Sequence, residues 1–557
     1  MSSGIVSTSN VPSSPTAVTT RTSKTKETMM AVEWHGSTEI KVNYKRARPS
    51  LVVSSIHAEQ TDAIVHVIAS TICGSDLHLY HKEIPGMRKG DIMGHEAIGI
   101  VHEVGERVSA VEVGDRVVVS AVISCGSCEY CKKGLFSCCD NTNPSKEMEE
   151  LYGNRIAGIF GYSHLTGGYD GCQAEYVRVP HANVNLLRLS AEEYKSLGKK
   201  SLLLSDVACT GWHANELGGV KNGDVVGIWG AGPVGLMTAA LALYRNASRV
   251  YVIDCIQARL DFARKIGAEV INFKEKDVVG IVKKSVPGGF DVTIDAVGFR
   301  YTNKSWRHKL ERAVFAETDS VEALDEAIRC TRKGGVVSIV GDYLNLANRF
   351  PIGAAMEKHL TLKGGQVHPQ KYWSDLLPIL SADEIFGRLF THYMKLSEAP
   401  KAYKKFDRKE DGIIKVFLIV DGKEFANFGE ILEEIASSSM FATIDTETDQ
   451  VEIIESEILT IKSAPVPSIS GGGENPAVKD LSTRSDPDIP NVSDGKGAES
   501  GKHSDIPINS ASTNITGENA SSAVKTSGDG KEKHVGIQDK VEGRSAKSDV
   551  INNSRKG

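Results

Sequence analysis

The hydrophobic pattern between residues 29 and 204 has a short period. Runs rich in Val and Ile alternate with glycine-containing turns, and the clearest runs are residues 62–71, 96–104, 114–122 and 174–179. Short β-branched runs bounded by glycine are typical of strands. We therefore predict a barrel or half-open sheet, rather than helices, for this part of the chain.

The hydrophobic pattern changes near Val225. The stretch "DVVGIWGAGPVGLMTAALALY" indicates a buried strand, a glycine turn and an apolar helix. Strand-like and helix-like segments then alternate at residues 249–254, 258–268, 269–273, 290–298, 320–335 and 336–343. This alternation predicts a parallel, doubly wound sheet. A closing strand within residues 412–422 returns to the first pattern, so we expect the α/β unit to interrupt another domain.

The two ends of the chain lack the apolar residues of a folded core. Ser and Thr dominate the first 28 residues, and no aromatic residue follows Phe441. Such segments bury too little surface to offset the entropy of ordering them. We predict that residues 1–28 form a disordered extension and residues 426–557 a mostly disordered tail. Residues 29–208 and 363–425 would form a first domain in two parts, and residues 209–362 would form the nucleotide-binding domain between those parts.

Composition narrows the class of protein. The 557 residues carry a formal net charge of -6 without a basic stripe, which argues against nucleic-acid binding. No apolar run approaches the roughly 18 residues of a membrane span, and no signal peptide is recognisable. We expect a cytoplasmic protein, with a mitochondrial leader as the alternative because Arg21, Lys24 and Lys26 lie in an acid-poor stretch. In a reducing compartment, the ten cysteines favour metal binding or catalysis over disulfides.

A glycine motif marks the predicted nucleotide site. Gly230, Gly232 and Gly235 fit G-x-G-x-x-G between a strand and a helix, and Asp254 ends the next strand. Gly230 permits a tight turn, Gly232 lets a pyrophosphate approach the backbone, and Gly235 allows close packing of helix and strand. Asp254 would accept hydrogen bonds from both ribose hydroxyls and repel a 2′-phosphate, so NAD is favoured over NADP. The alternative is a glycine turn in an α/β domain that binds no ligand.

The stretch "CGSCEYCKKGLFSCC" concentrates five cysteines. Cys125, Cys128, Cys131 and Cys139 would satisfy a tetrahedral zinc and leave no position for substrate, so this site is predicted to be structural. Cys138 competes with Cys139 as the fourth ligand. An iron-sulfur cluster is the rival occupant, because four thiolates suit it as well.

A second set of metal-binding residues is dispersed along the chain. Cys73 and His78 fall in "CGSDLH", His95 and Glu96 fall in "GHEA", and a further ligand is expected in "LSDVACTGWHA". A catalytic zinc needs about three protein ligands and one open position. Each residue alone is more often a buried cysteine or a surface histidine than a ligand. Only their combination favours a metal site.

The chain resembles the zinc-dependent medium-chain alcohol dehydrogenase family in motifs that occur in order: "CGSDLHLY", "GDIMGHEAIG", "VGDRVVV", the cysteine loop, "IFGYSHLTGGYDGCQAEYVRVP", "GAGPVG" and "KEDGIIKV". Its glutathione-independent formaldehyde dehydrogenase branch is most similar. The resemblance covers about residues 29–422 and neither tail. It implies a GroES-like β-barrel catalytic domain, a Rossmann domain, an active site between them, one catalytic and one structural zinc, and a dimer or tetramer.

The resemblance assigns roles to the dispersed residues. Cys73 and His95 are implied ligands of the catalytic zinc, and Glu96 is a neighbouring carboxylate that approaches the metal. Asp76 would orient His95 and fix its ring tautomer.

The third zinc ligand departs from the commoner family pattern. Four residues before the Thr-Gly pair that begins at Thr210, most members have a cysteine, whereas this chain has Asp206. We assign Asp206 as the ligand and keep Cys209 as the alternative. A carboxylate preserves two anionic ligands but donates less electron density than a thiolate, so the zinc should be somewhat more Lewis-acidic.

The remaining catalytic roles are also implied by the family. Zinc polarises the substrate oxygen, Ser75 passes its proton on, and His78 releases that proton to solvent. The residues expected around the cofactor are Thr210 and Val234 at the nicotinamide, Arg259 at the adenosine and Lys415 near the pyrophosphate.

The leading interpretation is a zinc- and NAD-dependent dehydrogenase for a small alcohol or aldehyde hydrate. Oxidation or dismutation of formaldehyde is the specific hypothesis, and residues 141–171 would favour dismutation by covering the cofactor. The alternatives are a dehydrogenase for polyols or larger alcohols, and a catalytically idle family member whose Ser-rich tail recruits partners. We expect a small-molecule substrate and neither a nucleic-acid nor a membrane partner.

Overall fold

The computed structural model describes residues 27–54, 57–58, 60–298, 320–344, 350–420, 442–445 and 450–453. The predicted disordered extension (1–28) and tail (426–557) lie almost wholly outside the described residues. Inside that tail, the structure forms two short antiparallel strands, β21 (Ala442–Asp445) and β22 (Gln450–Ile453). None of the helices in the described ranges is long and apolar enough to span a bilayer.

A seven-stranded sheet forms the first lobe. Its strands run in the order β12 (Leu186–Leu189), β8 (Arg116–Val119), β7 (Ala97–Val104), β5 (Ala63–Ile72), β20 (Lys415–Ile419) and β19 (Phe390–Lys395), and β11 (Tyr176–Val179) also pairs with β5. Every residue of β5 is buried, including the polar His66, Ser70 and Thr71. β20 pairs antiparallel with β5. The segments before and after the α/β unit therefore share one sheet, while the exact domain boundaries stay a prediction.

Smaller elements complete the first lobe. In the smaller pairings, β1 (Thr28–Gly36) pairs with both β2 (Glu39–Ala47) and β6 (Asp91–Ile92), β3 (Val52–Ser54) pairs with β4 (His57–Ala58), and β9 (Val122–Ile123) pairs with β10 (Gly158–Ile159). The helices are α1 (Asp76–Tyr80), α2 (Glu129–Lys132), α3 (Lys146–Tyr152), α4 (Ala182–Asn185), α5 (Ala191–Leu197) and α14 (Ala399–Arg408).

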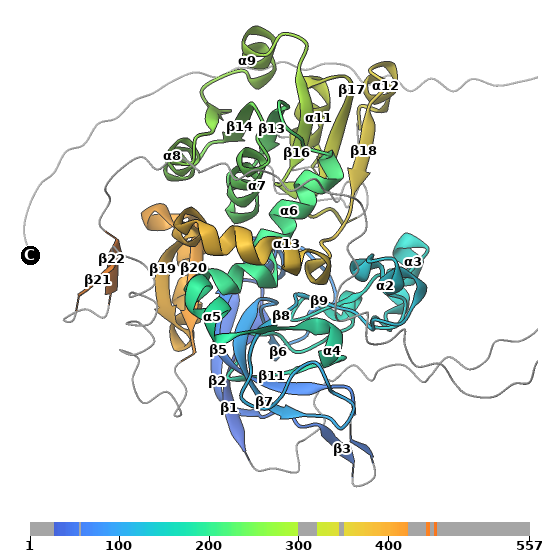
Figure 1. Ribbon diagram of the computed structural model, residues 1–557, viewed down its shortest axis with the longest axis vertical. Helices are drawn as coiled ribbons and strands as arrows, with labels where there is room; N and C mark the ends of the chain where they lie inside the picture. Colours follow the sequence, from blue (N-terminus) through green and yellow to red (C-terminus); the bar gives the residue numbers. More distant parts are fainter. Residues whose placement is uncertain are drawn as a thin grey trace, which may run out of the picture. The chain divides into compact units, whose positions relative to one another are not determined.

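The α/β unit is a six-stranded parallel sheet with helices around it (Figure 1). The strand order is β15 (Glu269–Asn272), β14 (Arg249–Asp254), β13 (Val225–Trp229), β16 (Phe290–Asp295), β17 (Thr331–Ile339) and β18 (Thr361–Gly364). Its helices include α7 (Pro233–Tyr244), α8 (Gln257–Lys265), α9 (Val278–Ser285), α11 (Glu322–Cys330) and α12 (Ile352–Glu357). The order reverses between β13 and β16, and ligands of doubly wound sheets bind at the carboxyl ends of strands beside such a reversal.

The boundary between α11 and β17 differs from the prediction. The sequence pattern predicts a helix through residue 335, whereas α11 ends at Cys330 and the strand begins at Thr331. The Thr331 hydroxyl lies 2.8 Å from the Thr293 hydroxyl of β16 and also donates to the Ala327 carbonyl. Thr331 is in register with Phe290 and Val336 with Val292, so the polar residues 332–335 form an irregularity in the strand rather than more helix.

One hydrophobic core spans both sheets. It includes Val118 of β8, Ile228 of β13, Phe417 of β20 and Leu376 of α13 (Pro369–Ala382). Buried residues of α6 (Val207–Gly218) belong to the same core. This packing fixes α6, the helix that begins after Asp206, between the two sheets.

Candidate metal and nucleotide sites

Four potential metal ligands converge in the interior of the first lobe. One atom from each of Cys73, His95, Glu96 and Asp206 lies within 4.8 Å of every other. His95 Nε2 is 3.4 Å from Asp206 Oδ2, and Cys73 Sγ is 4.0 Å from the same oxygen. Ligands of one tetrahedral zinc lie about 3.3–3.8 Å apart, given bonds of about 2.0–2.3 Å. These three groups are therefore spaced to hold a single ion.

Strand pairing explains why residues distant in sequence meet here. β5 and β7 are antiparallel neighbours, so Cys73, just past the end of β5, lies near His95, just before the start of β7. The hydroxyl of Ser205 accepts a hydrogen bond from the Ala97 backbone N–H at 3.2 Å. That bond ties the start of α6 to β7 and places Asp206 opposite the other two ligands.

The donor set fits a zinc ion. His95 Nδ1 lies 3.2 Å from Asp76 Oδ1, which matches the orienting role expected of Asp76, although the pair does not form a regular hydrogen bond. The second oxygen of Glu96, Oε2, is buried without a hydrogen-bond partner among the described residues. A thiolate, an imidazole and a carboxylate beside an unpartnered carboxylate oxygen are donors that suit zinc.

Negative charge dominates the electrostatics of this group. Burial alone would lower the pKa of His95, but Asp76 and Asp206 raise it well above its usual range. Burial would raise the pKa of Asp206, but His95 and the hydroxyl of Thr210 lower it. The first shift favours a positive charge on the ring and the second favours the ionised carboxylate, so these anionic surroundings favour a cation at this point.

Lys415 lies beside the candidate ligands. Its Nζ is 2.9 Å from Glu96 Oε1, and the two side chains are 0% and 1% exposed. Burial would lower the pKa of Lys415, but Glu96 and Cys73 raise it. We expected Lys415 near the pyrophosphate. The structure pairs it with Glu96, a contact that the sequence did not reveal, and its contact with a cofactor stays a prediction.

The structure favours Asp206 over Cys209 as the third ligand. Asp206 Oδ1 accepts a 2.6 Å hydrogen bond from the Thr210 hydroxyl, which leaves Oδ2 directed at the other ligands. The Cys209 thiol is buried and donates to the Leu204 carbonyl at 3.2 Å instead. Thr210 therefore orients the candidate ligand Asp206, and its predicted contact with nicotinamide stays a prediction.

The residue predicted to release the proton, His78, is buried in the structure. His78 is 4% exposed, because every residue of the short helix α1 is buried, so the imidazole does not itself reach solvent. Its Nδ1 lies 3.0 Å from Glu83 Oε2, and the Glu83 side chain is 19% exposed. Ser75 is half-buried at the start of the same helix. Glu83, which belongs to no motif, thus extends the predicted relay toward the surface.

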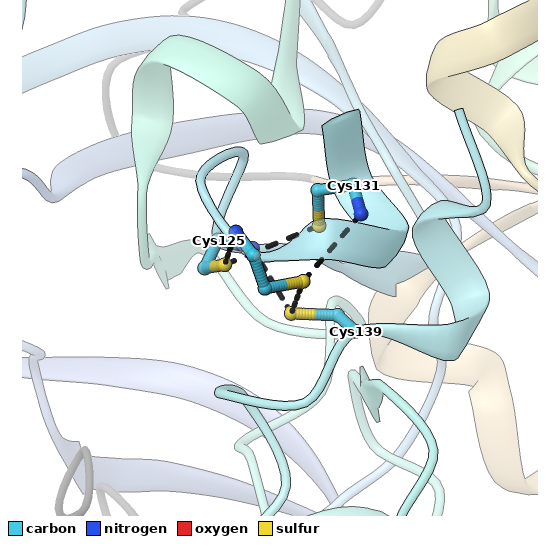
Figure 2. Close-up of side chains that lie close together, drawn as sticks. Cys125, Cys131 and Cys139 are labelled. Atoms are coloured by element: carbon cyan, nitrogen blue, oxygen red, sulfur yellow. Dashed lines mark hydrogen bonds between the residues drawn. The ribbon is translucent and has the colours of Figure 1, made fainter. Parts of the chain in front are cut away.

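The cysteine loop forms a second, separate group (Figure 2). The Sγ atoms of Cys125 and Cys131, and those of Cys128 and Cys139, are 4.0 Å apart. Hydrogen bonds from the thiols of Cys131 and Cys139 lower the pKa of Cys125, which favours a thiolate. The spacing suits one tetrahedral ion rather than a cluster of several irons. Cys138 lies outside the group, so Cys139 is the fourth candidate ligand.

The glycine turn has the shape of a phosphate site. A Cβ at Gly230 would lie 2.9 Å from Val297, and one at Gly235 would lie 1.9 Å from the Gly230 carbonyl oxygen. A Cβ at Gly232 would meet only an Arg259 nitrogen, at 3.9 Å. Folding therefore requires the first and last glycines, whereas Gly232 keeps space open before α7. No side chain caps that helix, so its N–H groups are available to an anion.

Asp254 and Arg259 flank this turn. Asp254 Oδ2 accepts a 2.7 Å hydrogen bond from the Ala231 backbone N–H, and Oδ1 accepts one of 2.6 Å from Cys255. The carboxylate is thus oriented and retains capacity for further donors. Arg259 is 9% exposed, with its Nε unpartnered among the described residues. Val234, half-buried in the first turn of α7, lies at the same edge.

Known proteins resemble this chain in both lobes. A profile described as the alcohol dehydrogenase GroES-like domain matches residues 59–189, and one described as zinc-binding dehydrogenase matches residues 233–311. A zinc-type alcohol dehydrogenase-like protein of Schizosaccharomyces pombe is 42% identical over 394 residues, which cover 70% of this chain and 90% of the relative. A glutathione-independent formaldehyde dehydrogenase of Pseudomonas aeruginosa is 32% identical over 375 residues, covering 64% and 88%.

A solved structure agrees with the fold. The alcohol dehydrogenase TADH from Thermus sp. ATN1 aligns with a TM-score of 0.59 and 32% identity, covering 70% of this chain and 100% of that one. The predicted combination of a GroES-like domain and a Rossmann-type domain is confirmed. This chain belongs to the zinc-type alcohol dehydrogenase family of oxidoreductases.

Proposed function

We propose that the protein oxidises a small alcohol, or the hydrate of a small aldehyde such as formaldehyde, with NAD as hydride acceptor. The convergence of Cys73, His95 and Asp206 in the interior carries this proposal. The similarity to proteins named as formaldehyde dehydrogenases supports a small substrate.

Those three residues would hold the catalytic metal. A zinc bound there supplies a Lewis acid that lowers the pKa of a substrate hydroxyl. Cys73 and Asp206 together offset the charge of a divalent ion, and Lys415 offsets Glu96 at 2.9 Å. These five formal charges sum to zero, and the buried Asp76 carboxylate beside His95 adds one negative charge, so the site suits an uncharged substrate such as an alcohol rather than an anion.

The chain itself provides a route for the proton. The substrate hydroxyl would lose its proton to Ser75, and from there it would move to His78 and Glu83, whose side chains are 3.0 Å apart. A nicotinamide bound at the glycine turn would supply the acceptor for the carbon-bound hydrogen, which carries two electrons as hydride. An alcohol thereby becomes a carbonyl compound, and an aldehyde hydrate becomes a carboxylic acid.

Asp254 supports NAD over NADP. Its backbone hydrogen bonds fix the carboxylate beside the glycine turn, where it would accept from both ribose hydroxyls and repel a 2′-phosphate. Gly232 leaves space for the pyrophosphate at the start of α7.

Dismutation has support from a specific pair of contacts. We predicted that residues 141–171 cover the cofactor, and Tyr152 and Tyr162 of this segment donate to Leu344 O and Asp342 Oδ2 in the segment after β17, at 2.5 and 2.7 Å. A retained NADH would reduce a second aldehyde. Rapid, complete loss of bound NAD on dialysis would count against dismutation.

A turnover assay tests the proposal. Protein with zinc at both sites is mixed with NAD or NADP and a panel of small alcohols, formaldehyde and polyols, and NADH or NADPH absorbance is followed. We expect turnover of small substrates with a preference for NAD. No turnover by the fully zinc-loaded protein would refute the enzymatic function.

A further inference from the structure

Tyr162 lies against the candidate catalytic metal site. Its ring meets His95 edge to face, with centroids 6.2 Å apart and planes at 84°, and the residue is 8% exposed. The preceding backbone is also confined, because a Cβ at Gly161 would lie 2.5 Å from the Gly94 carbonyl oxygen. The segment before η2 (His164–Thr166) is therefore pressed against the chain that carries His95.

Asp342 approaches from the parallel sheet. It follows the end of β17, on the same edge of the sheet as Gly230 after β13 and Asp295 at the end of β16. This is the ligand-binding edge of a doubly wound sheet. A Cβ at Gly298 would lie 2.4 Å from the Asp342 carbonyl oxygen, so close packing fixes the Asp342 backbone at this edge.

A hydrogen bond joins the two residues. The Tyr162 hydroxyl donates to Asp342 Oδ2 at 2.7 Å. The other oxygen, Oδ1, is 3.5 Å from Gln366 Nε2, which is long for a hydrogen bond. Asp342 is half-buried and keeps capacity to accept another donor.

We propose that Tyr162 and Asp342 form a subsite for a second hydroxyl group of the substrate. The subsite would favour diols and aldehyde hydrates over simple alcohols of equal length. The proposal rests on the proposed function, since one hydroxyl is the group that is oxidised. Tyr162 donates to Oδ2 only, and covering the other carboxylate oxygen, Oδ1, without a good donor is unfavourable. A simple alcohol has no donor beyond the reacting hydroxyl, whereas a diol or hydrate has one for Asp342.

Ethanol and ethylene glycol, which differ by one hydroxyl, provide the test. The full-length, zinc-loaded enzyme and its variants are compared by the ratio of kcat/KM for ethylene glycol to that for ethanol. Asp342→Leu should lower this ratio by about tenfold to hundredfold, the range for a hydrogen bond to a charged group. Asp342→Asn, which preserves the shape, should lower it in the same direction. Tyr162→Phe retains the ring on His95 and should lower it by about threefold.

Tyr152→Phe is the matched control. It removes a hydrogen bond from the same segment to Leu344 O and should leave the ratio unchanged. If the Asp342 variants lose kcat/KM equally for ethylene glycol and ethanol, the Tyr162–Asp342 pair only links the two lobes, and the subsite is refuted. An equal ratio change in Tyr152→Phe would overturn it as well. A wild-type enzyme that oxidises neither compound, nor any other alcohol, would instead refute the proposed function.

Discussion

The Lys415–Glu96 ion pair ties the closing strand to the metal site. Lys415→Met retains most of the side-chain length and removes the charge. Glu96 is 1% exposed and would be left without its cation in the interior. We expect the folded state to be strongly destabilised, because a buried charge without a partner is far less favourable than a paired one.

The distance between Lys415 and Glu96 sets the size of the expected loss of unfolding free energy. At 2.9 Å the direct attraction is about 6 kcal/mol for an effective dielectric constant of about 20. Removing one partner of a buried pair typically costs about 3–5 kcal/mol, and we expect a loss of unfolding free energy in that range. The double variant Lys415→Met with Glu96→Gln removes both charges and should recover most of the loss.

Urea unfolding of the zinc-loaded proteins, followed by tryptophan fluorescence, measures these differences. The matched control is Lys405→Met, because Lys405 pairs with Asp411 at a similar distance, 2.7 Å, but Asp411 is 68% exposed. An exposed pair contributes little, because water and salt screen its attraction. If Lys415→Met is no more destabilising than Lys405→Met, or the double variant is no more stable than the single one, the reasoning is wrong.

Three further predictions concern the two metal sites and the glycine turn. His95→Ala should lose the catalytic zinc and activity while the fold survives, as zinc analysis and circular dichroism would show; full activity would contradict the ligand assignment. Cys128→Ser should chiefly reduce stability and solubility, and a stable protein that is merely slow would speak against a structural site. Gly232→Ala should raise the KM for NAD with little change in Tm, whereas Gly235→Ala should lower Tm by several degrees because its Cβ would lie 1.9 Å from a backbone oxygen. Equal Tm values for these two variants would contradict the proposed difference between the glycines.

Much of the fold was predictable because its signals are local. The glycine motif, the alternation of strands and helices, and the Val- and Ile-rich run of β5 each lie within a short stretch of sequence. The end of α11 was not predictable in this way. It depends on Thr331 meeting Thr293, which is 38 residues earlier in the chain.

In the candidate site too, residues with local sequence signals were predictable and contacts between distant residues were not. Cys73, His95 and the four-cysteine loop stand in recognisable motifs, so their residue types and spacing indicated metal binding. The contact of Lys415 with Glu96 joins residues 319 positions apart and depends on the pairing of β20 with β5. The proposed role of Glu83 could not be predicted, because it depends on the burial of His78.

X-ray absorption at the zinc edge of the purified protein tests most directly whether Cys73, His95 and Asp206 hold a catalytic zinc. The two predicted ions should together have five sulfur ligands, four from the cysteine loop and one from Cys73. His95→Ala should retain only the ion with four sulfurs. Six sulfurs shared by two ions would identify Cys209 in place of Asp206, and a wild-type protein that binds only the four-sulfur ion would contradict a catalytic zinc at this site.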